Sequence, residues 1–368
     1  MRNHRDGTGQ NNKYIRLVYY HKRKLYIILF LALLILFIIR SLGDGRNDNV
    51  QLNTNISIQF DRFNVYTPTE TYDKEEDSLY SLMMSDYFQS KLLYKNLAVV
   101  IPFPEKHLEK TLNAIKRWDQ VDRMPCDPSL LVNGKVYSKL SKFLPDLIFY
   151  TNFGRNQKII DQITDLINES QWKQCFKSLQ FIHANLTEEE DGYPRGPANQ
   201  FVKFYDMPIS RDYQYFFYME NDVVPIRRGW VLEIVRLTYM TEATRRRPFM
   251  AIGSTVREKE AFKRKVIQRF HVNGNAIWST SEQMRKFLTL VQEYYQPHYG
   301  KGLMWYDGEF FEYLLDSRNW LVSSVIYQDF IFYDFLQNYS QWPYNETLIK
   351  QDFPSTYLIH GLNNINSK

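Results

Sequence analysis

Short apolar runs alternate with amphipathic stretches through the middle of the chain. The run NLAVVIPF, Asn96–Phe103, is followed by KHLEKTLNAIKRW, residues 106–118, which has helical spacing. Further segments repeat this order: Asp146–Asn152 (strand), Ile159–Ile167 (helix), Ser178–Leu186 (strand), Ala198–Asp206 (helix) and Tyr213–Met219 (strand). Continuous apolar runs are typical of strands buried on both faces. Strands that alternate with helices predict an α/β fold, with a mainly parallel sheet flanked by helices.

Two acids end the last of these strands. The segment YQYFFYMENDVVPIRRGW, Tyr213–Trp230, places Glu220 and Asp222 directly after the aromatic run. Sheets of this kind bind ligands outside the carboxyl ends of their strands. In extended backbone, residues two apart project from the same face, so both carboxylates are expected to face one site. Two carboxylates at close range repel unless a positive charge lies between them, which predicts bound Mn²⁺ or Mg²⁺.

The spacing of the two acids is by itself weak evidence for a metal site. Glu188–Asp191 has the same acid-x-acid pattern in what is expected to be a solvated loop. The alternative for Glu220 and Asp222 is therefore a solvated strand-end loop paired with Arg227 and Arg228. The apolar strand before the acids, and the helix predicted from Trp230 after them, favour the metal site.

A second polar segment is FHVNGNAIWS, residues 270–279. It places Asn273, Gly274 and Asn275 between a short predicted strand and a predicted helix. Gly274 would allow close approach of the backbone to a ligand, and the Asn amides can donate hydrogen bonds to ligand hydroxyls. The alternative is an ordinary Asn-Gly turn.

Three motifs, YMENDVVPIRRGW, FHVNGNAIWS and YLIHG, are together similar to those of loosely characterised eukaryotic glycosyltransferase-like proteins. The order of elements resembles the GT-A class of nucleotide-sugar glycosyltransferases, over about residues 95–362. That class usually carries Asp-x-Asp where this chain has Glu-Asn-Asp, so Glu220 departs from the pattern by one methylene. The resemblance implies a Rossmann-like GT-A fold, a nucleotide-sugar donor and a glycan, glycoprotein or glycolipid acceptor.

The resemblance also implies roles for single residues. His360 of YLIHG would supply a third metal ligand, although a lone His after a strand is commonly structural. Asp307 and Glu309 of MWYDGEFFEYLL are candidates for the catalytic base of an inverting reaction, with Asp307 preferred. Their alternative role is to cap the N-terminus of a helix.

The segment YPRGPANQF, residues 193–201, precedes the acidic strand. Arg195 is a candidate contact for a diphosphate and Asn199 for the donor. The alternative is a loop ordered by Pro194 and Pro197.

The net charge of +5 is concentrated in the basic N-terminal tail, residues 1–24, so a nucleic-acid partner is not expected. Residues 25–43 contain the apolar run LYIILFLALLILFII and predict a single transmembrane anchor rather than a cleaved signal peptide. The positive-inside rule then predicts a type II protein. Residues 44–90 are expected to form a stem, and residues 91–368 a lumenal catalytic domain in the Golgi or endoplasmic reticulum.

Two features bear on that compartment. Sequons for N-glycosylation begin at Asn55, Asn168, Asn185, Asn338 and Asn345. The two cysteines, Cys126 and Cys175, are expected either to form one disulfide or to remain buried thiols.

The predicted function is therefore that of a divalent-metal-dependent glycosyltransferase. The alternative is a catalytically inactive, membrane-anchored module of the same fold that binds carbohydrate or acts as a scaffold. A metal-dependent phosphohydrolase would need more clustered acids than the sequence contains.

Overall fold

The computed structural model describes residues 96–127, 141–257, 271–300, 302–340, 342–361 and 364–365. The predicted tail, anchor and stem lie outside the described residues, as do the sequon at Asn55 and Phe270 of the FHVNGNAIWS motif. None of the helices in the described part combines the length and apolarity needed to cross a membrane.

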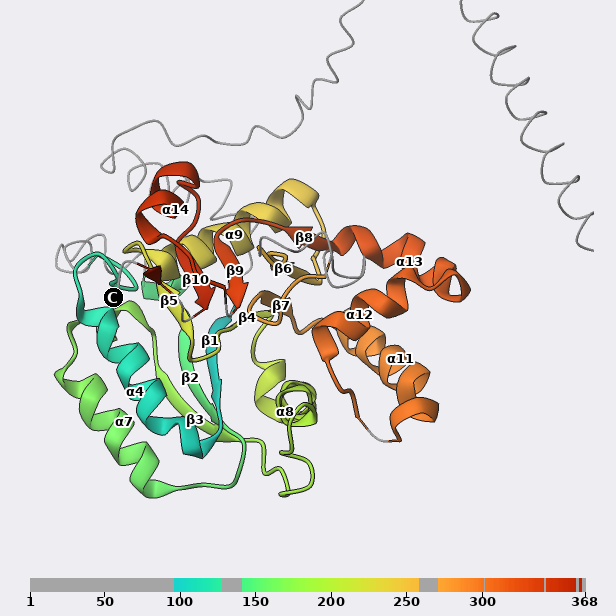
Figure 1. The fold of residues 1–368 in the computed structure, drawn as a ribbon, viewed down its shortest axis with the longest axis horizontal. Helices are drawn as coiled ribbons and strands as arrows, with labels where there is room; N and C mark the ends of the chain where they lie inside the picture. The colour runs from blue at the N-terminus through green and yellow to red at the C-terminus, as the bar shows by residue number, and fades with distance from the viewer. Residues whose placement is uncertain are drawn as a thin grey trace, which may run out of the picture. The chain divides into compact units, whose positions relative to one another are not determined.

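The described chain forms a mixed α/β structure (Figure 1). Its strands are β1 Leu97–Phe103, β2 Asp146–Thr151, β3 Leu179–His183, β4 Tyr215–Tyr218, β5 Val223–Pro225, β6 Ala251–Gly253, β7 Ile277–Ser279, β8 Phe330–Phe332, β9 Leu336–Ser340 and β10 Leu358–Gly361. Its α-helices are α4 Leu108–Lys116, α7 Gln157–Glu169, α8 Arg195–Asp206, α9 Trp230–Arg245, α11 Glu282–Tyr299, α12 Tyr306–Leu315, α13 Trp320–Ile326 and α14 Glu346–Asp352. Short 3₁₀ turns are Glu105–His107, Arg117–Asp119, Ser141–Phe143, Gln171–Cys175, Pro208–Arg211, Ser317–Asn319 and Tyr327–Asp329.

Within the described residues, a seven-stranded sheet has the order β3-β2-β1-β4-β7-β6-β8. Strand β7 is antiparallel to both of its neighbours, and the other adjacent pairs are parallel. The predicted mainly parallel sheet is thus confirmed. The chain passes from β1 outward to β2 and β3, and then returns to place β4 on the other side of β1. The strand order therefore reverses between β1 and β4, which is where open α/β sheets bind ligands.

Helices cover both faces of this sheet. Side chains of β1 alternate between two apolar clusters: Val99 and Ile101 join the cluster with α4, α7 and α9, whereas Ala98 and Val100 join the cluster with α8, α11 and α12. In Figure 1, α4 and α7 lie together, away from α8, α11 and α12. Every residue of β1 is buried, as expected for an inner parallel strand.

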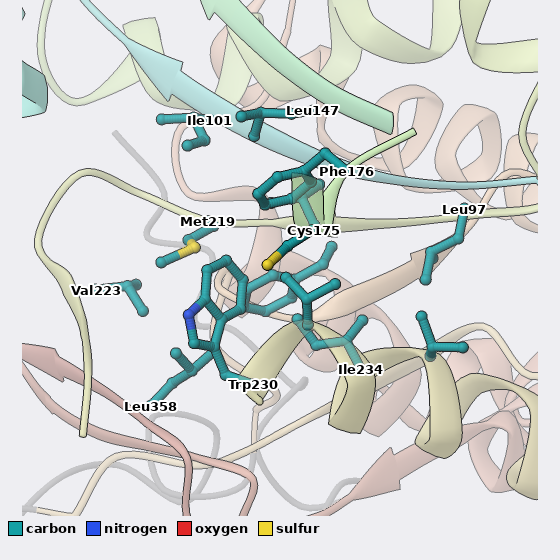
Figure 2. Close-up of a cluster of buried hydrophobic side chains, with 14 of the residues drawn as sticks. Leu97, Ile101, Leu147, Cys175, Phe176, Met219, Val223, Trp230, Ile234 and Leu358 are labelled. Carbon is teal, nitrogen blue, oxygen red and sulfur yellow. The ribbon is translucent and has the colours of Figure 1, made fainter. Parts of the chain in front are cut away.

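The first cluster contains a disulfide between Cys126 and Cys175, with 5.5 Å between their Cα atoms. This bond settles the alternative that the sequence left open. Figure 2 shows Cys175 among buried apolar side chains that include Phe176, Met219 and Trp230. The ring of Trp118 lies 4.9 Å from Trp172 and 5.0 Å from Trp230, centroid to centroid. The disulfide therefore joins two segments within a tightly packed aromatic core.

A second, three-stranded sheet has the order β5-β10-β9. The sequence did not predict it, because its strands are short and pair across long separations. Strand β5 begins one residue after Asp222, and β10 pairs with it in antiparallel fashion, with His360 opposite Val223. Because of this register, His360 lies beside the turn that follows β4, although the two are far apart in the sequence.

Candidate functional site

Glu220 and Asp222 lie in a turn directly after β4. The Val223 N–H donates to the Glu220 carbonyl over 3.0 Å, which closes the turn. The Asn221 amide points away from the acids and donates to Thr111 Oγ1 on α4 over 3.1 Å. The structure thus brings the two acids together as predicted, but the predicted reason was wrong, because a turn and not extended backbone orients them.

His360 completes this group. Its Nε2 atom lies 3.3 Å from Asp222 Oδ1 and 3.4 Å from Glu220 Oε2. One ligand atom from each of the three residues lies within 4.8 Å of the others. The side chain of His360 is 12% exposed, that of Asp222 24% and that of Glu220 37%, so the group is open to solvent on the Glu220 side.

The donor set fits a divalent cation. In the described part of the chain, the buried atoms Asp222 Oδ1 and His360 Nδ1 form no hydrogen bond, although Asp222 Oδ1 lies 3.3 Å from His360 Nε2 as an ion-pair contact. Carboxylate oxygens suit Mg²⁺ and Mn²⁺, and imidazole nitrogen suits several transition metals, so Mn²⁺ matches the mixture of ligands. Lys110 Nζ lies 3.7 Å from Asp222 Oδ2 and supplies positive charge beside the group.

The ionisation of these residues is coupled through their contacts. Partial burial raises the pKa of the Glu220 carboxyl; His360 and Asn275 oppose this rise, and the charge of Asp222 adds to it. Burial acts in the same direction on Asp222, but His360 and Lys110 outweigh it and lower the pKa of Asp222 to about 2. Burial alone would lower the pKa of His360, but Asp222 and Glu220 raise it above its ordinary value of 6.5. Without a cation, His360 lies against both acids, and their charges favour its protonated form.

The Asn273–Asn275 segment lies before β7 and not between a strand and a helix as predicted. Gly274 does not have a positive φ, which excludes a type I′ Asn-Gly turn at this position. Asn275 is fully buried, and its side chain binds both the backbone and the carboxylate of Glu220. Because Asn275 has no exposed atom, it cannot donate a hydrogen bond directly to a sugar hydroxyl, and this prediction was wrong. Asn273 accepts two hydrogen bonds from Asn275 and is partly exposed.

Asp307 and Glu309 lie in the first turn of α12, where the sequence placed them just before a helix. Asp307 Oδ2 accepts from the Gly274 N–H over 2.7 Å, and Oδ1 accepts from the Gly308 N–H over 3.0 Å. The charge of Asp307 reaches the acid-histidine group, since it contributes to raising the pKa of Glu220 and of His360. Both oxygens of Glu309 accept from the Met304 N–H over 3.2 Å, and burial raises the Glu309 pKa.

Arg195 and Asn199 lie on α8, which begins at Arg195, three residues before the predicted helix Ala198–Asp206 and within the segment for which a loop was the alternative. Arg195 Nε donates to Met304 Sδ over 2.8 Å, and Asn199 Nδ2 donates to the Glu190 carbonyl over 2.7 Å. Both residues lie beside the segment that leads into α12, since Arg195 contacts Met304 and a Cβ atom on Gly302 would lie 2.7 Å from Asn199 Oδ1.

Two residues near the acids were missed by sequence reasoning. Lys110 lies in the predicted helix after the first strand, but no local spacing links it to Asp222. His271 Nε2 lies 3.8 Å from Asp307 Oδ2, and its ring packs edge-on against Trp305. His271 adjoins the quoted Asn-Gly-Asn motif, so its position beside that motif was the available signal.

Comparison with known proteins gives no match to a family model and none to a curated protein. Among solved structures, the chain is similar to the glycosyltransferase GlyE of Streptococcus pneumoniae TIGR4, with 10% identity over 65% of this chain and 45% of that chain and a TM-score of 0.36. It is also similar to the bifunctional glycosyltransferase WbbM, with 9% identity over 74% and 47% of the two chains and a TM-score of 0.38. The mannosyltransferase Ktr4p of S. cerevisiae shows 10% identity over 67% and 74%, with a TM-score of 0.34. The chain spans less than half of GlyE and of WbbM, and similarity at this level does not by itself establish an activity.

Proposed function

We propose that the described part of the chain is the core of a divalent-metal-dependent glycosyltransferase. It would move a sugar from a nucleotide-diphosphate sugar to an acceptor hydroxyl. One observation carries the proposal: Glu220, Asp222 and His360 meet after β4, beside the point where the strand order reverses. The resemblance of the element order to GT-A transferases, and of the three sequence motifs to glycosyltransferase-like proteins, agrees with it.

The chemistry of glycosyl transfer explains what such a group is for. A bound Mn²⁺ or Mg²⁺ would neutralise charge that develops on the departing diphosphate. Glu220, Asp222 and His360 would hold the cation, and Lys110 would add positive charge for a phosphate. In an inverting reaction Asp307 would take the proton of the acceptor hydroxyl. We prefer Asp307 to Glu309 because Asp307 accepts from the Gly274 N–H, next to Asn275, which binds Glu220, whereas Glu309 binds the Met304 N–H.

We further propose that the protein is a single-pass type II protein of the Golgi or endoplasmic reticulum membrane, with its catalytic domain in the lumen. The apolar segment within residues 25–43 and the basic residues before it support this orientation. The disulfide between Cys126 and Cys175 supports an oxidising compartment, because disulfides are rare in the cytosol.

Thermal stability of the full-length protein with nucleoside diphosphates tests the donor site. A nucleoside diphosphate at about 100 times its Kd should stabilise the fold by about 2.7 kcal/mol, and only when Mn²⁺ is present. Equal stabilisation with and without Mn²⁺ would refute metal dependence, and no stabilisation by any nucleoside diphosphate would refute the donor class.

A second candidate function is a catalytically inactive module that binds carbohydrate or acts as a scaffold. The observation that favours it is Glu220, which stands where the resembling transferases usually carry Asp. Such a module would bind a glycan or a nucleotide-sugar without releasing a nucleoside diphosphate. Measuring product release in the presence of a bound donor separates the two functions.

A further inference from the structure

Asn275 makes a two-point contact with Glu220. Its Oδ1 accepts from the Glu220 backbone N–H over 2.8 Å, and its Nδ2 donates to Glu220 Oε2 over 2.8 Å. The orientation of this amide is unambiguous, because the backbone N–H of Glu220 needs an acceptor and the Glu220 carboxylate needs a donor. The contact folds the long Glu220 side chain back over its own backbone.

Asn273 in turn fixes the position of Asn275. Asn273 Oδ1 accepts from both the backbone N–H and the Nδ2 of Asn275, over 3.1 Å and 3.0 Å. Both N–H groups of the Asn275 amide are therefore engaged, and the side chain is fully buried. At Gly274 a Cβ atom would lie 2.2 Å from the Tyr306 hydroxyl oxygen, so the loop packs directly against α12.

We infer that Asn275 is a positioning residue that fixes the Glu220 carboxylate for a divalent cation, an inference that rests on the metal site of the proposed function. Glu has one more rotatable bond than Asp, so a Glu ligand loses more side-chain freedom when it binds a metal. The Asn275 amide removes that freedom before the cation arrives. The pair Glu220–Asn275 thereby compensates for the departure from Asp-x-Asp.

This role differs from one in which Asn275 only stabilises the fold. A purely structural residue would affect cation binding to the same extent whether position 220 is Glu or Asp. A positioning residue loses its effect when the carboxylate becomes too short to reach the amide. A double-mutant cycle between positions 220 and 275 measures this difference.

The metal-free, full-length protein is titrated with Mn²⁺ alone, and the concentration of free Mn²⁺ is measured at each step by electron paramagnetic resonance. Asn275→Ala should weaken Mn²⁺ binding about 10- to 100-fold, which is the usual effect of losing a group that orients a metal ligand. In a Glu220→Asp background the same substitution should weaken binding less than about 3-fold, because the carboxylate no longer reaches Asn275 Nδ2 and only the backbone contact remains. Asn221→Ala, in the same turn but bonded to Thr111, is the matched control and should bind Mn²⁺ like the wild type.

Asn273→Ala provides a second variant if Asn275→Ala fails to fold, because it removes the support behind Asn275 at a partly exposed position. It should weaken Mn²⁺ binding in the Glu220 protein and not in the Glu220→Asp protein. Equal losses in both backgrounds, or no loss in either, would overturn the positioning role while leaving the metal site standing. Absence of Mn²⁺ binding in the wild type would overturn both this inference and the proposed function.

Discussion

His360 Nε2 lies 3.3 Å from Asp222 Oδ1, although the two residues come from distant parts of the chain. The contact depends on the small sheet: β10 pairs with β5, and the register sets His360 opposite Val223, the residue after Asp222. A histidine near the C-terminal end thereby becomes part of the site that follows β4.

Replacing His360 tests whether it is a ligand. His360→Gln should weaken Mn²⁺ binding by at least about 10-fold, because losing a group that merely orients a ligand already costs about 10- to 100-fold. Calorimetric titration of the purified protein measures the change. His298→Gln, at an exposed position on α11, is the control and should leave Mn²⁺ binding unaltered. Unchanged affinity in His360→Gln would remove His360 from the metal site.

Cation affinity and metal-free stability should respond to pH in opposite directions. A cation needs an ionised Glu220 and a neutral His360, so Mn²⁺ affinity should rise with pH as these groups lose their protons. The folded pKa values of Glu220 and His360 lie above their ordinary values of 4.5 and 6.5. The folded state therefore binds these protons more tightly than the unfolded state, and the metal-free protein should lose stability as pH rises through the folded pKa values.

The pH dependence of stability that comes from Asp222 has the opposite sign. Its pKa is lowered to about 2, so the stability that it contributes is present at neutral pH and is lost only as pH falls through that value. Urea unfolding at several pH values, with and without Mn²⁺, checks these signs. In His360→Gln, the metal-free stability loss that comes from proton release by His360 should disappear, and the loss that comes from Glu220 should move to higher pH, because His360 lowers the Glu220 pKa. A pH dependence that is the same in this variant would contradict the assignment to His360.

The disulfide between Cys126 and Cys175 should be a major source of stability. The two cysteines are 49 residues apart in the sequence. For a closed loop of this length, the chain-entropy relation predicts about 4 kcal/mol. Unfolding of the Cys126→Ala/Cys175→Ala protein should therefore show a lower free energy by about this amount, measured by urea denaturation. Dithiothreitol should destabilise the wild type and leave the double variant unaffected; equal stability of the two proteins would contradict the prediction.

The sequons within the described residues should differ in their use if the domain is lumenal. Asn185 and Asn168 are exposed, whereas Asn338 is buried in β9 and has no room for a glycan. Mass spectrometry after deglycosylation should therefore find glycans at Asn185 or Asn168 and none at Asn338. Asn185→Gln together with Asn168→Gln should increase the gel mobility of the protein, and Asn338→Gln should not. Absence of glycans from both exposed sites would count against the lumenal orientation.

The sequence predicted the inner part of the fold well. The apolar run Asn96–Phe103 became β1, Leu97–Phe103, and the stretch after it became α4, because period and burial agree in these segments. The error at Asn273–Asn275 has a local cause. The strand that adjoins them, β7, has only three residues and follows the motif, and such short strands carry little periodic signal.

The sequence predicted which residues form the candidate site, but not how the fold brings them together. The motif identified Glu220 and Asp222, and the resemblance pointed to His360. The turn after β4, the pairing of β10 with β5 and the contact between Lys110 and Asp222 depend on non-local packing, which no spacing in the sequence encodes. Asn275 was predicted to bind a sugar hydroxyl, because a sequence does not show which side chains are exposed. Its burial and its contact with Glu220 favour a positioning role instead.

The most direct test of the proposed function is release of nucleoside diphosphate from a panel of nucleotide-sugars by the full-length protein. At least one nucleotide-sugar should release its nucleoside diphosphate in the presence of Mn²⁺ and not in the presence of a chelator. Asp222→Asn, which keeps the shape of the side chain and removes its charge, should abolish this release without unfolding the protein. Mn²⁺-independent release, or full activity in Asp222→Asn, would contradict a metal-dependent glycosyltransferase built on Glu220, Asp222 and His360.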